Sequence, residues 1–207
     1  MTALLAPANG EPLNVALIAR LLGVSHPTAA LRIRDLQRLG LVRLLPFFGP
    51  GKKPILYLRG RYGAGLADFR AFCIEAIITR LGEIFPESRF SWWKTGRVRQ
   101  IDLVAEAGEE RIGFCFAAAQ ATRNSAWLPL AMGCKRGLIH RGYLLHSGKR
   151  AFIIGRAVHA LPLSEFLAEP GEWILRRRTE SESRAARNRI NALALQAARL
   201  DSPGRGA

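Results

Sequence analysis

Hydrophobic positions between residues 13 and 39 recur at the spacing of an α-helix. In the first predicted helix they are Val15, Ile18, Ala19 and Leu22, and in the second they are Ala29, Ile33 and Leu36. We expect Gly23 to end the first helix, because glycine adopts the left-handed conformation at little steric cost. Ser25 is a favoured N-cap for the second helix, and Gly40 is expected to end it. The pattern therefore predicts two short helices separated by a tight turn.

The pattern changes to short apolar runs after Gly40. Leu41–Leu45 and Ile55–Leu58 are predicted to be strands, joined by a hairpin over residues 46–54 that contains proline, glycine and two lysines. Two helices followed by such a hairpin are typical of a winged helix-turn-helix, which we place at residues 13–62. Residues 1–12 are expected to form a flexible lead in front of it.

A long helix and a series of strands are predicted for residues 63–175. The helix runs from Leu66 to about Leu81, with Gly82 expected to end it, and Glu75 falls nearly opposite its apolar stripe. The later elements, in order, are strands at residues 89–94, 99–105 and 111–116, a helix at 125–134, and strands at 142–146 and 151–154. This order is typical of an α/β domain, so the chain is expected to be α/β, or α+β overall.

Residues 176–207 are predicted to form a C-terminal amphipathic helix and a tail. Thr179 and Glu182 have the spacing of a capping box at a helix start. The apolar positions that follow alternate at four- and three-residue spacing: Ala186, Ile190, Leu193, Ala197 and Leu200. This stripe either docks on the preceding domain or forms a homodimer, and the pattern leaves both open.

Composition adds a strong positive charge to this picture. The chain has a formal net charge of +15, which favours a polyanionic partner such as nucleic acid. Residues 13–59 hold eight basic residues against Asp35 alone, residues 60–110 are almost balanced, and residues 111–178 hold eleven bases against three acids. The positive charge therefore falls on the predicted winged helix and on the later part of the α/β domain.

The sequence has no pattern typical of a membrane or secreted protein. No run of about 18 apolar residues exists, and the N-terminal residues do not have the pattern of a signal peptide. Cys73, Cys115 and Cys134 lie in apolar contexts, so we expect free, buried thiols. We therefore expect a cytoplasmic protein without a membrane partner.

The winged helix predicts a specific set of DNA contacts. Its second helix would enter the major groove of duplex DNA, and its hairpin would follow the backbone. The predicted DNA-binding residues are Ser25, His26, Thr28, Arg32 and Arg34 in the helix, Lys52 and Lys53 in the hairpin, and Lys135, Arg136, Lys149 and Arg150 in the α/β domain. Leu31 lies on the same helix surface and favours the alternative that this unit docks on a protein.

Three segments taken together resemble a known family. In order they read LLPFF…GKKPILYLR, WWKTGRVRQIDLV and RGYLLHSGKRAFIIGRAVHALPLSEF. Their order, covering about residues 13–166, is similar to the C-terminal region of a large group of prokaryotic AAA-type ATPases. The resemblance implies a winged helix followed by a restriction-endonuclease-like domain of unassigned function. No Walker-type segment occurs in this sequence, so we do not expect it to hydrolyse ATP.

The resemblance also implies a metal site for phosphodiester cleavage. Glu75 would supply one carboxylate and Asp102 another, and the next strand would supply a Glu-x-Lys pair. That strand reads RIGFCFAAA from Arg111, and the expected positions fall on Phe114 and Phe116, or on Cys115 and Ala117, so the pair is absent. Glu106 and Lys135 are conceivable relocated ligands.

Glu75 and Asp102 are therefore predicted to be vestigial ligands. Each also has an ordinary structural interpretation: Glu75 as a solvated acid, and Asp102 as the ion-pair partner of Arg97 or Arg99. No cofactor is expected, with Mg²⁺ required only if cleavage survives.

Three functions follow from these observations. The first is a catalytically silent DNA-binding protein, such as a transcriptional regulator or an accessory factor. The second is a metal-dependent nuclease with relocated catalytic residues. The third is a protein-interaction module that partners a separate ATPase or another protein.

Overall fold

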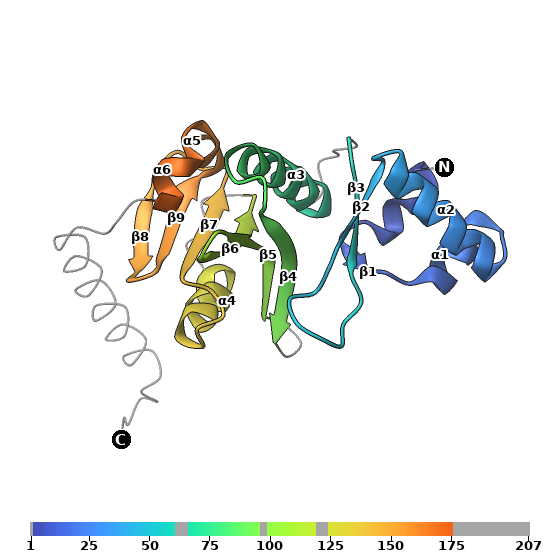
Figure 1. Ribbon diagram of the computed structural model, residues 1–207, viewed down its shortest axis with the longest axis horizontal. Coiled ribbons are helices and arrows are strands. Elements are labelled where there is room, and N and C mark those ends of the chain that lie inside the picture. The colour runs from blue at the N-terminus through green and yellow to red at the C-terminus, as the bar shows by residue number, and fades with distance from the viewer. Residues whose placement is uncertain (1, 61–65, 96–98, 119–123, 176–207) are drawn as a thin grey trace, which may run out of the picture.

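The computed structural model describes residues 2–60, 66–95, 99–118 and 124–175, which form a mixed α/β protein with two sheets (Figure 1). The smaller sheet and its helices make up an N-terminal unit, residues 2–60. Its elements are the 3₁₀-helix η1 (Thr2–Ala8), β1 (Glu11–Pro12), α1 (Val15–Leu22), α2 (His26–Arg38), β2 (Val42–Leu45) and β3 (Ile55–Leu58). The two helices and the strand hairpin predicted for residues 13–59 are all present.

Local chemistry sets the ends of α1 and α2 as predicted. Gly23 follows α1 in the left-handed conformation, with φ of 63°. The Ser25 hydroxyl accepts a hydrogen bond from the backbone N–H of Thr28 at 3.3 Å, which caps the start of α2. At the other end, Gly40 has φ of 67°, and the N–H of Leu41 donates to the carbonyl of Leu36 at 2.9 Å. This bond pattern is that of a Schellman turn, so the chain leaves α2 in a fixed direction.

Strand β3 is the centre of the N-terminal unit. It lies between β1 and β2 in an antiparallel sheet, and all four of its residues are buried. Leu56 and Leu58 pack with α1 and α2, whereas Ile55 and Tyr57 join the large core around α3. Alternate side chains of a strand point to opposite faces. The run ILYL therefore has no polar position, because both faces of this strand are covered.

The prediction of a flexible lead over residues 1–12 is wrong for the described residues 2–12. Leu5 and Ala8 are buried against α1, and β1 pairs with β3. The Asn9 side chain accepts a hydrogen bond from the backbone N–H of Leu58 at 3.0 Å and donates one to Asp68 at 2.8 Å. The segment has no helical or strand periodicity, so its order could not be predicted from the sequence pattern. The burial of Leu5 and Ala8 and the hydrogen bonds of Asn9 fix it in place.

The C-terminal unit, residues 66–175, is built on a six-stranded sheet. Its elements are α3 (Leu66–Ile84), β4 (Arg89–Thr95), β5 (Arg99–Ala107), β6 (Glu110–Ala117), α4 (Asn124–Lys135), β7 (Arg141–His146), β8 (Phe152–Gly155), β9 (Val158–Pro162), α5 (Leu163–Ala168) and α6 (Pro170–Leu175). The strand order is β4-β5-β6-β7-β9-β8, with the pairs β6–β7 and β7–β9 parallel and the others antiparallel.

Helices cover both faces of this sheet. Helices α3, α5 and α6 pack on one face and α4 packs on the other (Figure 1). Two glycines allow α4 to lie close to the strands. A Cβ at Gly142 would come within 2.7 Å of Leu130, and one at Gly113 within 2.6 Å of Ile139 in the following loop. Both distances are below normal carbon–carbon contact, so only glycine fits without a shift.

One helix boundary and three elements differ from the sequence predictions. Helix α3 continues through Gly82 to Ile84, because Leu81 is fully buried and its carbonyl accepts from the Phe85 N–H at 2.7 Å. Packing thereby offsets the roughly 1 kcal/mol that a glycine costs within a helix. Strand β9 and helices α5 and α6 were not predicted as separate elements. The helix predicted within residues 176–207 lies outside the described residues.

The two units share one hydrophobic core. Leu45, Ile55 and Tyr57 of the N-terminal sheet pack in the same cluster as α3 and the large sheet. The hairpin between β2 and β3 also joins β4, where the Trp92 N–H donates to the Pro46 carbonyl at 2.8 Å and the Phe48 N–H to the Trp92 carbonyl at 2.7 Å. The N-terminal sheet and the large sheet therefore contribute side chains to one hydrophobic cluster, and the boundary predicted between residues 62 and 63 lies outside the described residues. Within the described part of the chain, no helix has the length and apolar character to span a membrane.

Candidate functional site: a basic helix and two buried carboxylates

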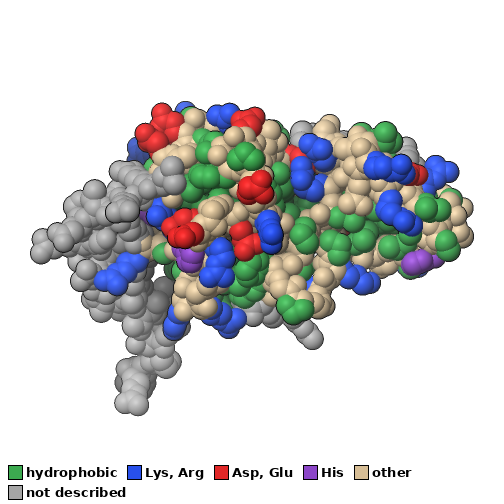
Figure 2. Space-filling model, viewed as in Figure 1, with side chains coloured by type: hydrophobic (Ala, Val, Ile, Leu, Met, Phe, Trp, Pro, Cys, Tyr) green, Lys and Arg blue, Asp and Glu red, His purple; other side chains and the backbone are tan. Residues whose placement is uncertain are grey.

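Helix α2 carries four of the eleven residues predicted to contact DNA. Ala29, Ile33 and Leu36 are buried, which leaves His26, Arg32 and Arg34 exposed and Thr28 half-buried. The single acid on this helix, Asp35, is ion-paired with Arg38. On the face seen in Figure 2, basic side chains are prominent over the N-terminal unit, and acidic ones are concentrated over the C-terminal unit. The structure therefore presents α2 as an accessible cationic surface.

Three of the residues predicted to contact DNA already have local roles. The Ser25 hydroxyl caps α2 and lies 2.8 Å from the Thr28 hydroxyl, so both side chains already take part in helix capping. The Lys52 ammonium donates to the Lys94 carbonyl at 2.8 Å and lies 4.7 Å from the Phe47 ring centre. Lys53 is exposed at the same hairpin tip. The hairpin therefore contacts β4 through Lys52, and both lysines remain exposed.

The basic residues of the C-terminal unit do not form one patch. Lys135 and Arg136 end α4 beside the start of β6, where the Arg111 side chain donates to the Gly137 carbonyl at 2.8 Å. Lys149 and Arg150 follow the other end of β7, where the Ser147 hydroxyl donates to the Ala118 carbonyl after β6. These two exposed pairs are separated by the length of β7, about 20 Å at 3.3 Å per residue. They lie at opposite ends of the sheet.

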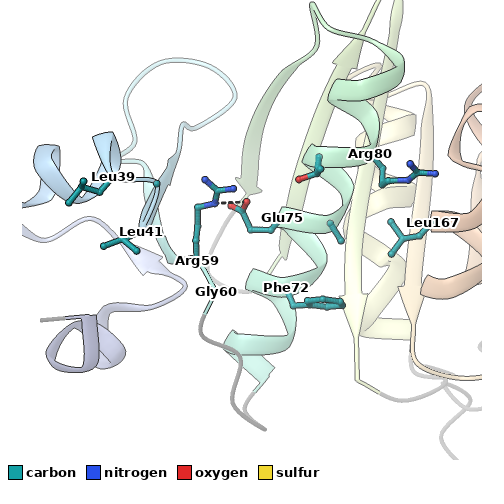
Figure 3. Close-up of a pocket in the computed structure, with 11 residues that line it drawn as sticks. Leu39, Leu41, Arg59, Gly60, Phe72, Glu75, Arg80 and Leu167 are labelled. Atoms are coloured by element: carbon teal, nitrogen blue, oxygen red, sulfur yellow. Dashed lines mark hydrogen bonds and ion pairs between the residues drawn. The ribbon is translucent and has the colours of Figure 1, made fainter.

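Glu75 is buried between the two units and is not the solvated acid that its helix position indicated. Its carboxylate accepts hydrogen bonds from Arg43 of β2, including one at 3.1 Å from Nη2. Arg59, directly after β3, donates from Nε at 2.8 Å (Figure 3). Two guanidinium groups of the N-terminal sheet therefore hold one carboxylate of α3. This contact joins the two units through charge-assisted hydrogen bonds.

Asp102 is also buried, but within the C-terminal unit. Ser91 pairs with Val104 and Trp93 with Ile101, so Asp102 and Leu103 lie opposite the single residue Trp92. This β-bulge changes the direction of the side chains at that point in β5. The Asp102 carboxylate accepts from the Phe116 N–H at 3.1 Å and from the Gln100 amide at 3.2 Å. It is held mainly by groups of its own sheet.

An arginine accompanies Asp102, although not one of the arginines considered from the sequence. The Nε of Arg70, on α3, lies 3.7 Å from the carboxylate. Arg97 and the side chain of Arg99 lie outside the described residues. The sequence did not predict Arg70 as the partner, because it lies far from Asp102 along the chain. A buried aspartate needs a cationic or hydrogen-bonding partner, but the sequence pattern does not say which residue supplies it.

Burial controls the protonation of the groups around Asp102. Burial raises the pKa of the Asp102 carboxyl, and the Arg70 guanidinium and the hydrogen bonds from Phe116 and Gln100 offset this only in part. Burial, assisted by the Asp102 charge, also raises the pKa of the Cys73 thiol to about 12 and raises that of Tyr57. Burial likewise raises the pKa of Cys115. These three side chains are therefore protonated at neutral pH, and none is an activated nucleophile.

Glu75 and Asp102 do not converge on a common point. Glu75 follows Arg70 by five residues on α3, which corresponds to about 140° around a helix axis. Arg70 reaches Asp102, whereas Glu75 reaches Arg43 and Arg59 on the N-terminal sheet. The two carboxylates implied for one metal site therefore serve two separate sets of arginines.

The remaining donors do not complete a metal site either. Phe114 and Phe116 of β6 are buried in the core beside α3, where the resemblance implied a Glu-x-Lys pair. Glu106 lies opposite Arg89 and Arg111 in the strand register, and Lys135 ends α4 on the other face of the sheet. Among the described residues, no three His, Cys, Asp or Glu side chains form a group that would hold a metal ion. These residues do not fit the divalent cation of a nuclease.

No family model matches the chain, and neither a curated protein nor a solved structure matches it.

Proposed function

We propose that this protein binds duplex DNA through the solvent-facing side of α2 and does not cleave it. In this proposal the N-terminal unit is a winged helix-turn-helix whose α2 enters the major groove. The observation that carries the proposal is the surface of α2, where Arg32, Arg34 and His26 are exposed beside a single acid that already pairs with Arg38. Such a surface attracts phosphates and releases condensed counterions when it binds.

The C-terminal unit is proposed to be a restriction-endonuclease-like domain that has lost the residues needed for phosphodiester cleavage. The order of α3, three strands, α4 and further strands supports this, as does the burial of Asp102 in the second of those strands. Phe114 and Phe116 would then occupy positions where such domains hold a cation and orient water, while arginines pair with Glu75 and Arg70 lies beside Asp102. The protein would then act as a transcriptional regulator or an accessory factor, with DNA binding as its activity.

Binding is measured by fluorescence anisotropy with a labelled duplex of about 20 base pairs between 50 and 200 mM salt. Affinity should fall steeply with salt, because phosphate contacts release counterions. Arg34→Ala should weaken binding by several-fold and reduce the salt slope by about one. The matched control is Arg156→Ala, which removes the same charge from an exposed turn of the C-terminal unit and should change affinity little.

His26→Ala sharpens the same test, because His26 lies near the start of α2 where base edges would be read. It should alter the preference among duplex sequences more than the overall affinity. Equal losses for Arg34→Ala and Arg156→Ala would show that the chain binds DNA only through its net charge. Undetectable binding at 50 mM salt would refute the proposal.

A further inference from the structure

An open groove lies where the two units meet, on the side of α3 that bears Glu75. It has a volume of about 750 Å³, and we call it the inter-unit groove. Leu39 and Leu41 line it from the N-terminal unit, Phe72 from α3 and Leu167 from α5 (Figure 3). Arg59 and Arg80 supply the guanidinium groups along it. The inter-unit groove therefore combines an apolar lining with cations.

Its apolar side chains are exposed to an unusual degree. Leu39 is 70 % exposed, and Leu41 and Phe72 are each 40 % exposed. Single exposed leucines are common on protein surfaces and need no explanation. Three large apolar side chains that come from two units and line one groove form a patch, and such patches mark binding sites.

The backbone that carries the two leucines is fixed by hydrogen bonds. Leu39 and Leu41 flank Gly40, the left-handed residue of the Schellman turn that ends α2. The N–H groups of Gly40 and Leu41 donate to Gln37 at 3.0 Å and to Leu36 at 2.9 Å. A turn fixed in this way loses little conformational freedom when a partner covers it, which lowers the entropic cost of binding.

The charges of the inter-unit groove select an anionic partner. Arg43 and Arg59 share the single carboxylate of Glu75, so this cluster carries one excess positive charge. Arg80 pairs with Glu83, but both side chains are about half exposed, and exposed pairs of this kind contribute little. Arg80 is therefore able to exchange Glu83 for a carboxylate of a partner.

We propose that the inter-unit groove binds an acidic segment of another protein whose leucine or aromatic side chains cover Leu39, Leu41 and Phe72. This site is separate from the surface proposed to bind DNA. Leu39 follows the last residue of α2, whereas the proposed DNA contacts His26, Arg32 and Arg34 lie within the helix and do not line the groove. A partner is therefore able to occupy the inter-unit groove while α2 contacts DNA.

The test begins with a display library of random 16-residue peptides selected on the immobilised full chain. The enriched peptides should have a negative net charge and contain leucine or aromatic anchors. Their affinity, measured by fluorescence anisotropy, should fall about tenfold in Leu39→Ser, because an anchor contact at the centre of a site is lost. Leu31→Ser is the matched control, since it makes the same change at an exposed leucine of the same helix outside the groove.

Arg80→Glu tests the charge selection, and it should weaken the acidic peptides while leaving the binding of duplex DNA unchanged. No enrichment, enrichment of basic peptides, or equal losses in Leu39→Ser and Leu31→Ser would overturn the proposal. Two further results would assign another occupant and overturn it as well. One is a synthetic peptide of residues 179–200 that binds more tightly than the enriched peptides and depends on Leu39. The other is a dimer in sedimentation analysis that Leu39→Ser dissociates.

Discussion

Glu75 and Asp102 are two buried carboxylates with very different surroundings. Glu75 joins two units of the protein through two arginines, Arg43 and Arg59. Asp102 lies inside one unit, where the Phe116 N–H and the Gln100 amide bond it and Arg70 lies farther away, at 3.7 Å. The difference shows that a buried acid in a predicted nuclease domain does not by itself indicate a metal site. The partners of each acid decide its role, and here they are guanidinium and amide groups.

Removal of Glu75 should have the largest effect on stability. Glu75→Ala would leave Arg43 and Arg59 close together at a largely buried position without a counter-charge. We expect a loss of about 3 kcal/mol in the free energy of unfolding, the low end for a broken buried pair, because both arginines keep some contact with water.

The measurement is urea denaturation at pH 7. Glu83→Ala is the control, because it breaks the exposed pair with Arg80 on the same helix and should cost less than about 1 kcal/mol. Similar losses in the two variants would contradict the assignment of Glu75 as the contact that joins the units.

Removal of the Asp102 carboxylate should have a smaller effect. Asp102→Ala leaves the Phe116 N–H buried without an acceptor and should cost about 2 kcal/mol at pH 7. Ser91→Ala, a substitution on the neighbouring strand, is the control, because no partner of the Ser91 hydroxyl is found among the described residues. If Asp102→Ala lowered the free energy of unfolding more than Glu75→Ala, Asp102 and not Glu75 would be the more important of the two acids for stability.

The pH dependence of stability separates the two acids further. The pKa of Asp102 is raised by burial, so the folded protein holds this proton to a higher pH than the unfolded chain. The stabilisation from this shift is complete below the ordinary aspartate pKa of 3.8 and is lost as the pH rises through the folded-state pKa. The free energy of unfolding of the wild-type protein minus that of Asp102→Asn should therefore decrease between pH 4 and pH 8, because only the wild type loses this proton. An increase in this quantity over the same range would show that the pKa is lowered instead.

Removal of Arg70 should have the smallest effect. Its Nε lies 3.7 Å from Asp102, and its side chain is 38 % exposed. Arg70→Met should therefore cost less than about 1 kcal/mol at pH 7. The loss should be smaller still at pH 4, where Asp102 is closer to neutral. A loss of several kcal/mol would mean that Arg70, and not the backbone of Phe116, holds the carboxylate.

Much of the element order could be predicted from the sequence, because local patterns determine it. Ser25 and Gly23 have the same roles as in the sequence prediction, and α1, α2, β2 and β3 follow from apolar spacing. The long-range contacts could not be predicted in this way. Leu5 has no periodic neighbours, and its burial depends on α1. Gly82 lies inside α3 because the packing of Leu81 outweighs the local preference of glycine.

The site was predictable in part for the same reason. The departure of β6 from a Glu-x-Lys pattern could be read directly, as could the positive charge of α2. The solvated interpretation of Glu75 was wrong, because the helical pattern of α3 shows one apolar face and does not reveal that another unit covers the opposite side. A signal was present in the run ILYL of β3, which has no polar position and therefore predicts a strand buried on both faces.

The most direct test of the central claim is a plasmid assay with saturating protein and either Mg²⁺ or Mn²⁺. Because arginines and amides, and not a metal ion, hold Glu75 and Asp102, the account predicts that supercoiled plasmid is retarded in a gel and recovered intact after the protein is removed. Nicked or linear plasmid that appears with the wild-type protein and disappears with Asp102→Asn would contradict it.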